Sequence, residues 1–169
     1  EKYISAIADR IINHRKKFSS SKKLLLSFHG IPQSYIARDE PYQDQCFKTA
    51  ELIVEKLQLK PESYDIVFQS RFGKAEWIKP YLAETLEKLG KSNEDDIQVF
   101  CPGFVSDCLE TIEEINEESR ELFLESGGKK FDYIPCLNGD SKFIDALESI
   151  IDNRDHLAIS YKRILEKIT

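Results

Sequence analysis

Four short strand-like segments, each followed by a segment with helical periodicity, constrain the fold of this 169-residue chain most strongly. The first, residues 24–28 (Leu-Leu-Leu-Ser-Phe), is apolar without alternation, which is typical of a strand buried on both faces of a parallel sheet. Strand followed by helix, repeated in this way, predicts an α/β fold with a four-stranded parallel sheet flanked by helices and right-handed crossovers. The other three strands are expected at residues 64–69, 96–101 and 131–134.

Apolar residues that recur every three or four positions indicate where the helices lie. Pro80 is expected in the first turn of its helix, where proline is tolerated, and Gly90 is expected to end that helix. Residues 16–23 are basic and serine-rich and are predicted to form a linker. The helices are expected at residues 3–15, 44–57, 77–89, 107–124, 141–151 and 156–168.

Composition narrows the class of protein. With 41% hydrophobic and 32% charged residues the chain can bury a core, and its net charge of -6 argues against a nucleic-acid partner. No apolar run approaches the roughly 18 residues of a membrane span, and no signal peptide is visible. Isolated cysteines without a C-x-x-C pair favour free thiols in a reducing cytoplasm over zinc or iron–sulfur sites. They are Cys46, Cys101, Cys108 and Cys136.

The absence of methionine bears on completeness. The chain begins at Glu1 and has no methionine at all, so it lacks an initiator. We therefore expect a fragment of a longer chain; a processed or tag-trimmed protein is the alternative.

A histidine closes the first predicted strand. Ligands of open parallel sheets bind at the carboxyl ends of the strands, and His29 stands at such an end within S-F-H-G-I-P. An imidazole there can act as a general base or a metal ligand near neutral pH. The alternative is a histidine that is merely hydrogen-bonded into the strand end. The other histidines, His14 and His156, lie on predicted terminal helices and are expected at the surface.

Carboxylates follow the third predicted strand at four-residue spacing. Glu110, Glu114 and Glu118 share one helix face, and a π-helical form would align them more closely. Asp107 is also a plausible helix cap, with Glu110 at the third position of a capping box. A solvated helix is the alternative, because further glutamates crowd the neighbouring face: Glu113, Glu117 and Glu121.

The second predicted strand ends in Gln69, Ser70 and Arg71. An arginine can bind a carboxylate through a bidentate fork, and Trp77 can form a flat apolar wall for a planar ligand. The alternative for Trp77 is a helix start that packs on the sheet. Nucleotide-binding and hydrolase functions lose support, because the chain has no G-x-G-x-x-G, P-loop or G-x-S-x-G motif.

Five segments in order resemble the carboxyl-terminal half of ferrochelatase, the terminal enzyme of protohaem synthesis. The F-Q-S-R-F-G and D-C-L-E-T forms are most similar to bacterial enzymes that act on protoporphyrin IX. The segments are L-L-L-S-F-H-G-I-P (24–32), P-Y-Q-D-Q-C (41–46), F-Q-S-R-F-G-K-A-E-W (68–77), C-P-G-F-V-S-D-C-L-E-T-I-E-E-I (101–115) and Y-I-P-C-L-N (133–138).

The resemblance implies roles for individual residues. His29 matches the active-site histidine, which binds metal or takes a proton from a pyrrole nitrogen, and Glu110 matches the catalytic glutamate facing it across the porphyrin cleft. Asp107, Glu114 and Glu118 match an acidic conduit for protons or metal on a partly π-helical segment. Cys108 stands where some relatives carry a second histidine. The porphyrin pocket is expected to include Ser27, Gln69, Ser70, Arg71 and Trp77.

The resemblance also implies a domain organisation and partners. Residues 20–154 would form a Rossmann-like chelatase lobe, preceded by an interlobe or crossover helix and linker at 1–19 and followed by a terminal helix at 155–169. The substrates would be protoporphyrin IX and Fe²⁺, with no tightly bound cofactor and no iron–sulfur cluster. The partner would be the missing amino-terminal lobe, without which we expect little or no activity. Location would be cytoplasmic, with peripheral membrane contact left open.

Two other functions stay open. The chain could be a stand-alone porphyrin- or metal-binding module without turnover. It could also be a chelatase for another tetrapyrrole and metal, such as cobalt into sirohydrochlorin. That class normally uses more than one histidine, and only His29 is well placed here.

Overall fold

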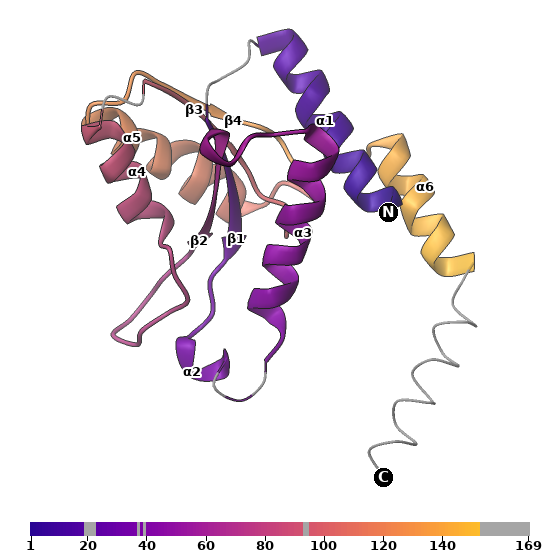
Figure 1. Ribbon diagram of the computed structural model, residues 1–169, viewed down its shortest axis with the longest axis horizontal. Helices are drawn as coiled ribbons and strands as arrows, with labels where there is room; N and C mark the ends of the chain where they lie inside the picture. The colour runs from indigo at the N-terminus through magenta and orange to yellow at the C-terminus, as the bar shows by residue number, and fades with distance from the viewer. Residues whose placement is uncertain (19–22, 37, 39, 93–94, 153–169) are drawn as a thin grey trace.

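A four-stranded parallel sheet forms the centre of the computed structural model, as predicted (Figure 1). The strand order is β2-β1-β3-β4, and each neighbouring pair is parallel. The structure describes residues 1–18, 23–36, 38, 40–92 and 95–152. The strands are β1 (Lys23–His29), β2 (Tyr64–Gln69), β3 (Asp96–Phe100) and β4 (Lys130–Tyr133).

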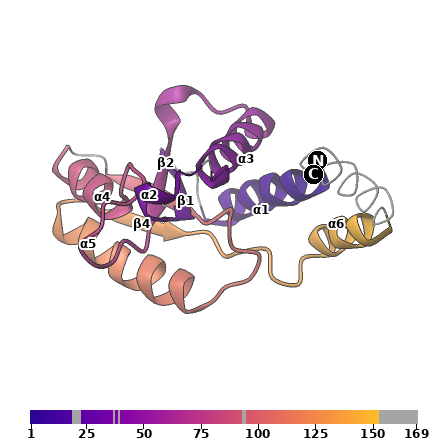
Figure 2. The same ribbon diagram turned by 90° about the horizontal axis from the view of Figure 1, so that it is seen from below.

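Helices cover both faces of this sheet, and Figure 2 shows α3 and α5 on opposite sides of it. Leu24, Leu26 and Phe28 of β1 pack against α1 and α3, whereas Leu25 packs into a second core with α4, η2 and α5. β1 is therefore buried on both faces, as its unbroken apolar run predicted. The helices are α1 (Lys2–Phe18), α2 (Gln33–Ile36), α3 (Tyr42–Leu57), 3₁₀-helix η1 (Pro61–Ser63), α4 (Leu82–Lys91), π-helix η2 (Glu110–Ser119), α5 (Arg120–Glu125) and α6 (Ser141–Asp152).

The helix predicted at 77–89 begins five residues later than expected. The stretch from Trp77 to Tyr81 is extended, with a cis peptide bond before Pro80. It pairs with other strand ends: the nitrogen of Ile78 donates to the carbonyl of Ile31 at 3.0 Å, and Phe68 donates to Pro80 at 2.8 Å. These tertiary hydrogen bonds override the local helical pattern.

Gly90 does not end that helix, because α4 continues to Lys91. A Cβ atom at Gly90 would lie 2.8 Å from the Cβ atom of Ser126, so the glycine permits close approach of the segment after α5. The end predicted for the acidic helix is confirmed: Gly127, at φ 111°, and Gly128 donate to carbonyls of its last turn.

The linker predicted at 16–23 is shorter than expected, because α1 continues through Phe18 and β1 begins at Lys23. The helix predicted at 156–168 lies outside the described residues, so the domain boundaries stay predictions. Among the residues that the structure describes, no helix is both long and apolar enough to cross a membrane.

Candidate functional site

The loops that follow the four strands meet at one edge of the sheet, because all four strands are parallel. His29 ends β1 and is half-buried there. Its Nδ1 lies 2.6 Å from the carbonyl oxygen of Gly30. A carbonyl only accepts, so Nδ1 carries the hydrogen, and the neutral ring presents the lone pair of Nε2 as a base or metal ligand. The hydroxyl of Tyr42 donates to the carbonyl of His29 at 2.8 Å and fixes the strand end.

An aromatic group lies beside this imidazole. The ring of Trp77 is 8% exposed, and its centroid is 6.4 Å from that of His29. Gly30 makes this approach feasible, because a Cβ atom there would lie 2.9 Å from the carbonyl oxygen of Gln69 and 3.0 Å from the indole. Phe72, which the sequence reasoning missed, packs 6.2 Å from Trp77 and is 80% exposed. The second phenylalanine of F-Q-S-R-F-G was the only feature of the sequence that could have indicated this residue.

Glu110 is the first residue of η2 and is exposed. The thiol of Cys108 donates to its Oε2 at 3.1 Å. This hydrogen bond is the main cause of a lowered pKa for Glu110, followed by the hydrogen bond from its own backbone nitrogen and, as a smaller cause, the charge that His29 carries when it is protonated. The carboxylate is therefore ionised near neutral pH and lies within electrostatic range of the imidazole.

Glu114 links η2 to the end of β2. Its two carboxylate oxygens accept hydrogen bonds from the backbone nitrogen and the hydroxyl of Ser70, each at 2.6 Å. Glu114 and Glu118 both line a cleft of about 240 Å³ between η2, α4 and the end of β2. Arg71 stands at the same cleft, where it contacts Glu84 at 3.4 Å and lies 4.4 Å from the centroid of the Tyr81 ring.

Asp107 does not cap the helix, so the predicted capping box is wrong: η2 has no side-chain cap. The hydroxyl of Thr111 instead accepts from the backbone nitrogen of Cys108 at 2.9 Å. The carboxylate of Asp107 accepts hydrogen bonds from the segment after β4, as described below. The local S/T/D-x-x-E pattern could not reveal partners this far along the chain.

Ser27 and Gln69 lie beneath the site and not on its surface. Their side chains are 0% and 3% exposed, and the hydroxyl of Ser27 donates to Oε1 of Gln69 at 2.8 Å. The thiol of Cys101 contacts the same oxygen at 3.5 Å. The structure thus brings the expected pocket residues into one region, with Ser70 and Arg71 facing outward and Ser27 and Gln69 as a buried polar layer.

His14 is not the surface residue that its helix position predicted. Its side chain is 10% exposed, and Nε2 lies 3.0 Å from the carboxylate of Asp132 in β4. The partner is 118 residues away in sequence, so no local pattern indicated the pair. His156, also predicted at the surface, lies outside the described residues.

The four cysteines are free thiols, as predicted; Cys46, Cys101 and Cys136 are buried, whereas Cys108 is partly exposed. Within the described ranges, no three side chains of histidine, cysteine, aspartate or glutamate converge as metal ligands. A cation held between His29 and Glu110 would therefore complete its coordination with water or with ligand atoms.

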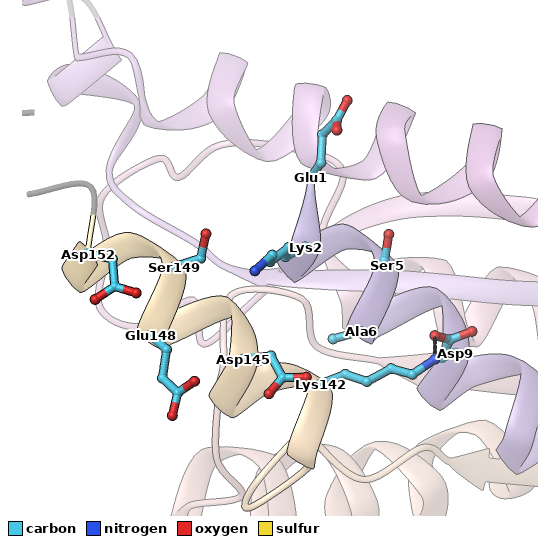
Figure 3. Close-up of a pocket in the computed structure, with 10 residues that line it drawn as sticks. All are labelled: Glu1, Lys2, Ser5, Ala6, Asp9, Lys142, Asp145, Glu148, Ser149 and Asp152. Carbon is cyan, nitrogen blue, oxygen red and sulfur yellow. Dashed lines mark hydrogen bonds and ion pairs between the residues drawn. The ribbon is translucent and has the colours of Figure 1, made fainter. Parts of the chain in front are cut away.

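A larger hollow, of about 550 Å³, lies between α1 and α6 (Figure 3). Five of the ten residues that line it are acidic, and Lys142 forms an ion pair with Asp9 across it. None of the residues that line it belongs to the loops around His29 and Glu110. Its size therefore does not make it part of the site at the strand ends.

Fold and site together define a parallel α/β domain with an imidazole and a row of carboxylates at the carboxyl edge of its sheet. The sequence model of the Ferrochelatase family matches residues 1–155. The chain belongs to the ferrochelatase family.

Curated relatives agree with this assignment. The ferrochelatase of Marinobacter nauticus is 50% identical over 151 residues, which cover 89% of this chain and 41% of the relative. That of Chromobacterium violaceum is also 50% identical over 151 residues, 89% of this chain and 42% of the relative. The Teredinibacter turnerae protein is 45% identical over 168 residues, 98% of this chain and 46% of the relative. The chain thus spans less than half the length of these relatives.

Proposed function

We propose that this chain forms one wall of an enzyme that inserts Fe²⁺ into protoporphyrin IX, the last step of haem biosynthesis. The observation that carries the proposal is the placement of His29 and Glu110 at the same edge of the sheet: His29 ends β1, and Glu110 follows β3, the strand paired with β1. When it is protonated, His29 also lowers the pKa of Glu110. Membership of the ferrochelatase family supports the same reaction.

The chemistry suits these two groups. Insertion requires that two pyrrole protons leave the macrocycle and that the ferrous ion lose its water. The Nε2 lone pair of a neutral His29 is a base of suitable strength and a fair ligand for Fe²⁺. Ionised Glu110 can accept or relay a proton from the side of the macrocycle that it faces. Fe²⁺ is here a substrate, and the proposal needs no resident cofactor or iron–sulfur cluster.

Glu114 and Glu118 would carry cations inward or protons outward. Both line the cleft beside η2, and the two hydrogen bonds from Ser70 fix the carboxylate of Glu114. Asp107 was expected in the same conduit, but it does not line this cleft. We therefore restrict the conduit to the two glutamates.

The macrocycle would lie against the aromatic side of the site. Trp77 offers an apolar ring beside His29, and Arg71 offers a guanidinium group that matches the geometry of a propionate. Ser70 would lie at the edge of the pocket, with its hydroxyl and backbone nitrogen bound to Glu114. Ser27 and Gln69 would stiffen the floor beneath it, since both side chains are buried.

The site would be completed by another part of the protein. Because the chain spans 41% of the Marinobacter nauticus relative, we propose that an amino-terminal lobe supplies the opposite wall. Without it, we expect little or no activity. We place the enzyme in the cytoplasm. The hydrophobic product would favour additional, peripheral contact with a membrane.

A module that binds porphyrin or metal without turnover is the second candidate, because the matched segment is less than half of each relative. The mass of the protein purified from its native source separates the two functions. A mature species of 19.6 kDa would favour the module, and a species about twice as large would favour the enzyme.

The direct test joins this chain to the residues that precede the matched segment in the Marinobacter nauticus relative. Iron insertion into protoporphyrin IX is then measured for the joined protein and for His29→Ala and Glu110→Ala. Both changes should reduce the rate at least 100-fold, and Glu121→Ala, an exposed glutamate on α5, should not. Unchanged rates for both variants would end the assignment of the site. Cobalt insertion into sirohydrochlorin, measured in parallel, tests the other chelatase class.

A further inference from the structure

We propose that Tyr133 and Asn138 are positioning residues that hold Glu110 in place through Asp107. On this view Asp107 anchors the start of the π-helix and is not a step in the path of ions or protons. The effect on iron insertion rests on the proposed function, whereas the anchoring itself does not.

Asp107 is surrounded by donors from the segment after β4. The hydroxyl of Tyr133 donates to its Oδ1 at 2.6 Å, and the backbone nitrogen of Cys136 donates to the same oxygen at 3.1 Å. The side-chain nitrogen of Asn138 donates to Oδ2 at 2.6 Å. Both carboxylate oxygens therefore accept hydrogen bonds from the segment after β4, and Asp107 does not line the cleft that holds Glu114 and Glu118.

Asn138 binds Asp107 in both directions. Its side-chain oxygen also accepts from the backbone nitrogen of Asp107 at 2.9 Å, and its own backbone nitrogen donates to the carbonyl of Val105 at 2.9 Å. Asn138 adopts a left-handed conformation, with φ 52°, which asparagine tolerates better than most residues. One residue thus ties the loop before η2 to the loop after β4 by three hydrogen bonds.

Electrostatics favours the same arrangement. Burial acts to raise the pKa of Asp107, but hydrogen bonds from Tyr133, Asn138 and Cys136 outweigh it, and the pKa is lowered. The pKa of Tyr133 is raised, first by burial and then by its hydrogen bond to Asp107. A neutral phenol that donates to an ionised carboxylate is one of the stronger hydrogen bonds in proteins.

Only two residues separate this anchor from Glu110, and contacts span the interval. The hydroxyl of Thr111 approaches Oδ1 of Asp107 at 3.5 Å and accepts from the nitrogen of Cys108 at 2.9 Å. The thiol of Cys108 in turn donates to Glu110. Since η2 has no side-chain cap, the Asp107 cluster is what fixes the position and direction of its first turn.

Helix α1 supports both loops from the other side. The hydroxyl of Tyr3 donates to the carbonyl of Pro102 at 2.7 Å, and Nη2 of Arg10 donates to the carbonyl of Leu137 at 2.9 Å. The two loops that Asp107 and Asn138 join are therefore held against one helix. Loss of the contacts between Asp107 and Asn138 would therefore change the direction of η2, whereas the contacts of α1 with the two loops would remain.

An exchange of the two side chains separates an anchor from a conduit. Asp107→Asn alone places two amide groups face to face, and Asn138→Asp alone places two carboxylates face to face. The Asp107→Asn/Asn138→Asp double variant restores an amide opposite a carboxylate, and the new amide oxygen still accepts from Tyr133. Position 107 has no carboxylate in the double variant. If Asp107 acts in the conduit, the double variant should therefore not be rescued.

Hydrogen exchange of the 169-residue chain gives the first readout. We expect amides at 110–113 to exchange at least tenfold faster in each single variant and within about twofold of the unmodified chain in the double variant. Asn116→Asp, which puts a new carboxylate elsewhere on η2, is the matched control and should leave those amides unchanged. Failure of the double variant to slow exchange, with native circular dichroism, would overturn the proposal.

Iron insertion by the joined protein gives the second readout. The single variants and Tyr133→Phe should lower kcat at least tenfold with the KM for protoporphyrin within about twofold, and the double variant should recover most of kcat. A double variant that anchors η2 but stays inactive would make the carboxylate itself essential and overturn the proposal. If the unmodified joined protein does not insert iron, the proposed function fails while hydrogen exchange still decides the anchor.

Discussion

Ser70 donates two hydrogen bonds to Glu114, one from its backbone nitrogen and one from its hydroxyl, each 2.6 Å long. The pair joins the end of β2 to the middle of the π-helix across 44 residues of sequence. Ser70 holds a left-handed backbone conformation, with φ 64°, that directs both donors at the same carboxylate. The side chain that we propose to lie in the conduit is thus fixed by the neighbouring strand.

Removing the hydroxyl of Ser70 should destabilise the chain. We expect Ser70→Ala to lower the free energy of unfolding by about 1.5 kcal/mol, because a hydrogen bond to a charged, half-buried group is lost. Urea denaturation monitored by circular dichroism measures the change. Ser63→Ala removes an exposed hydroxyl that bonds a backbone carbonyl and should cost less than about 0.5 kcal/mol. Equal effects of the two changes would contradict the special role of Ser70.

A methyl group at Gly30 should disturb the aromatic side of the site. The new Cβ atom would lie 2.9 Å from the carbonyl oxygen of Gln69 and 3.0 Å from the indole of Trp77. We expect Gly30→Ala to lower the free energy of unfolding by about 2 kcal/mol, as overpacking does. Trp77 is the only tryptophan of the sequence, so a red shift of the fluorescence would report its displacement.

Gly139→Ala is the matched control, since a Cβ atom there meets nothing within 4 Å. It should leave both the fluorescence and the unfolding midpoint near those of the unmodified chain. A similar loss at both glycines would point to a general effect of chain stiffness and not to contact with Trp77.

Asp107 should make stability depend on acid pH. Its pKa in the folded chain is lowered, so it stabilises the fold above its unfolded pKa of about 3.9, and this contribution is lost as pH falls below that value. The free energy of unfolding should therefore drop as the pH falls from about 5 through the unfolded pKa and below it, and less steeply in Asp107→Asn. Tyr133→Phe, which keeps the carboxylate but removes a donor, should give an intermediate slope. Identical slopes in all three proteins would refute the linkage.

Cys108 should be the one thiol that reacts quickly. Cys46, Cys101 and Cys136 are buried, and burial is the first cause that raises the pKa of Cys46 to about 11 and of Cys136 to about 12. Thiolates are the reactive form, so these thiols should react slowly in the native chain. Iodoacetamide followed by mass spectrometry should show one rapid addition, which Cys108→Ser abolishes. Two or more rapid additions in the native state would contradict this burial.

The sequence predicts the strands well because each is a short segment rich in apolar residues, with polar residues or turn signals at its ends. β2 has the predicted bounds 64–69, and the apolar run of β1 indicated its burial on both faces. The extended stretch before α4 was missed, since its hydrogen bonds go to Ile31 and Phe68 and not to its own turn. Helical periodicity carries no information about such distant partners.

The residues of the candidate site were likewise predictable only where local sequence patterns or the family resemblance indicated them. His29 and Glu110 could be singled out because they stand at strand ends, and the π-helical form was expected from resemblance and is confirmed. The partners of Asp107 could not be found, because Tyr133 and Asn138 lie 26 and 31 residues further along the chain. Short polar contacts between loops depend on how the strands are ordered, which local patterns leave open.

The position of β1 between β2 and β3 has a consequence for how the sequence of such a chain can evolve. An edge strand can accept substitutions by shifting slightly into solvent, but β1 has neighbours on both sides and cores on both faces. A change of side-chain volume at residues 24–28 is therefore transmitted along the strand to the imidazole at its end. Divergence within the family should accordingly be slowest in β1 and fastest at the exposed residues of η2 outside the proposed site, Ile112, Glu113 and Glu117.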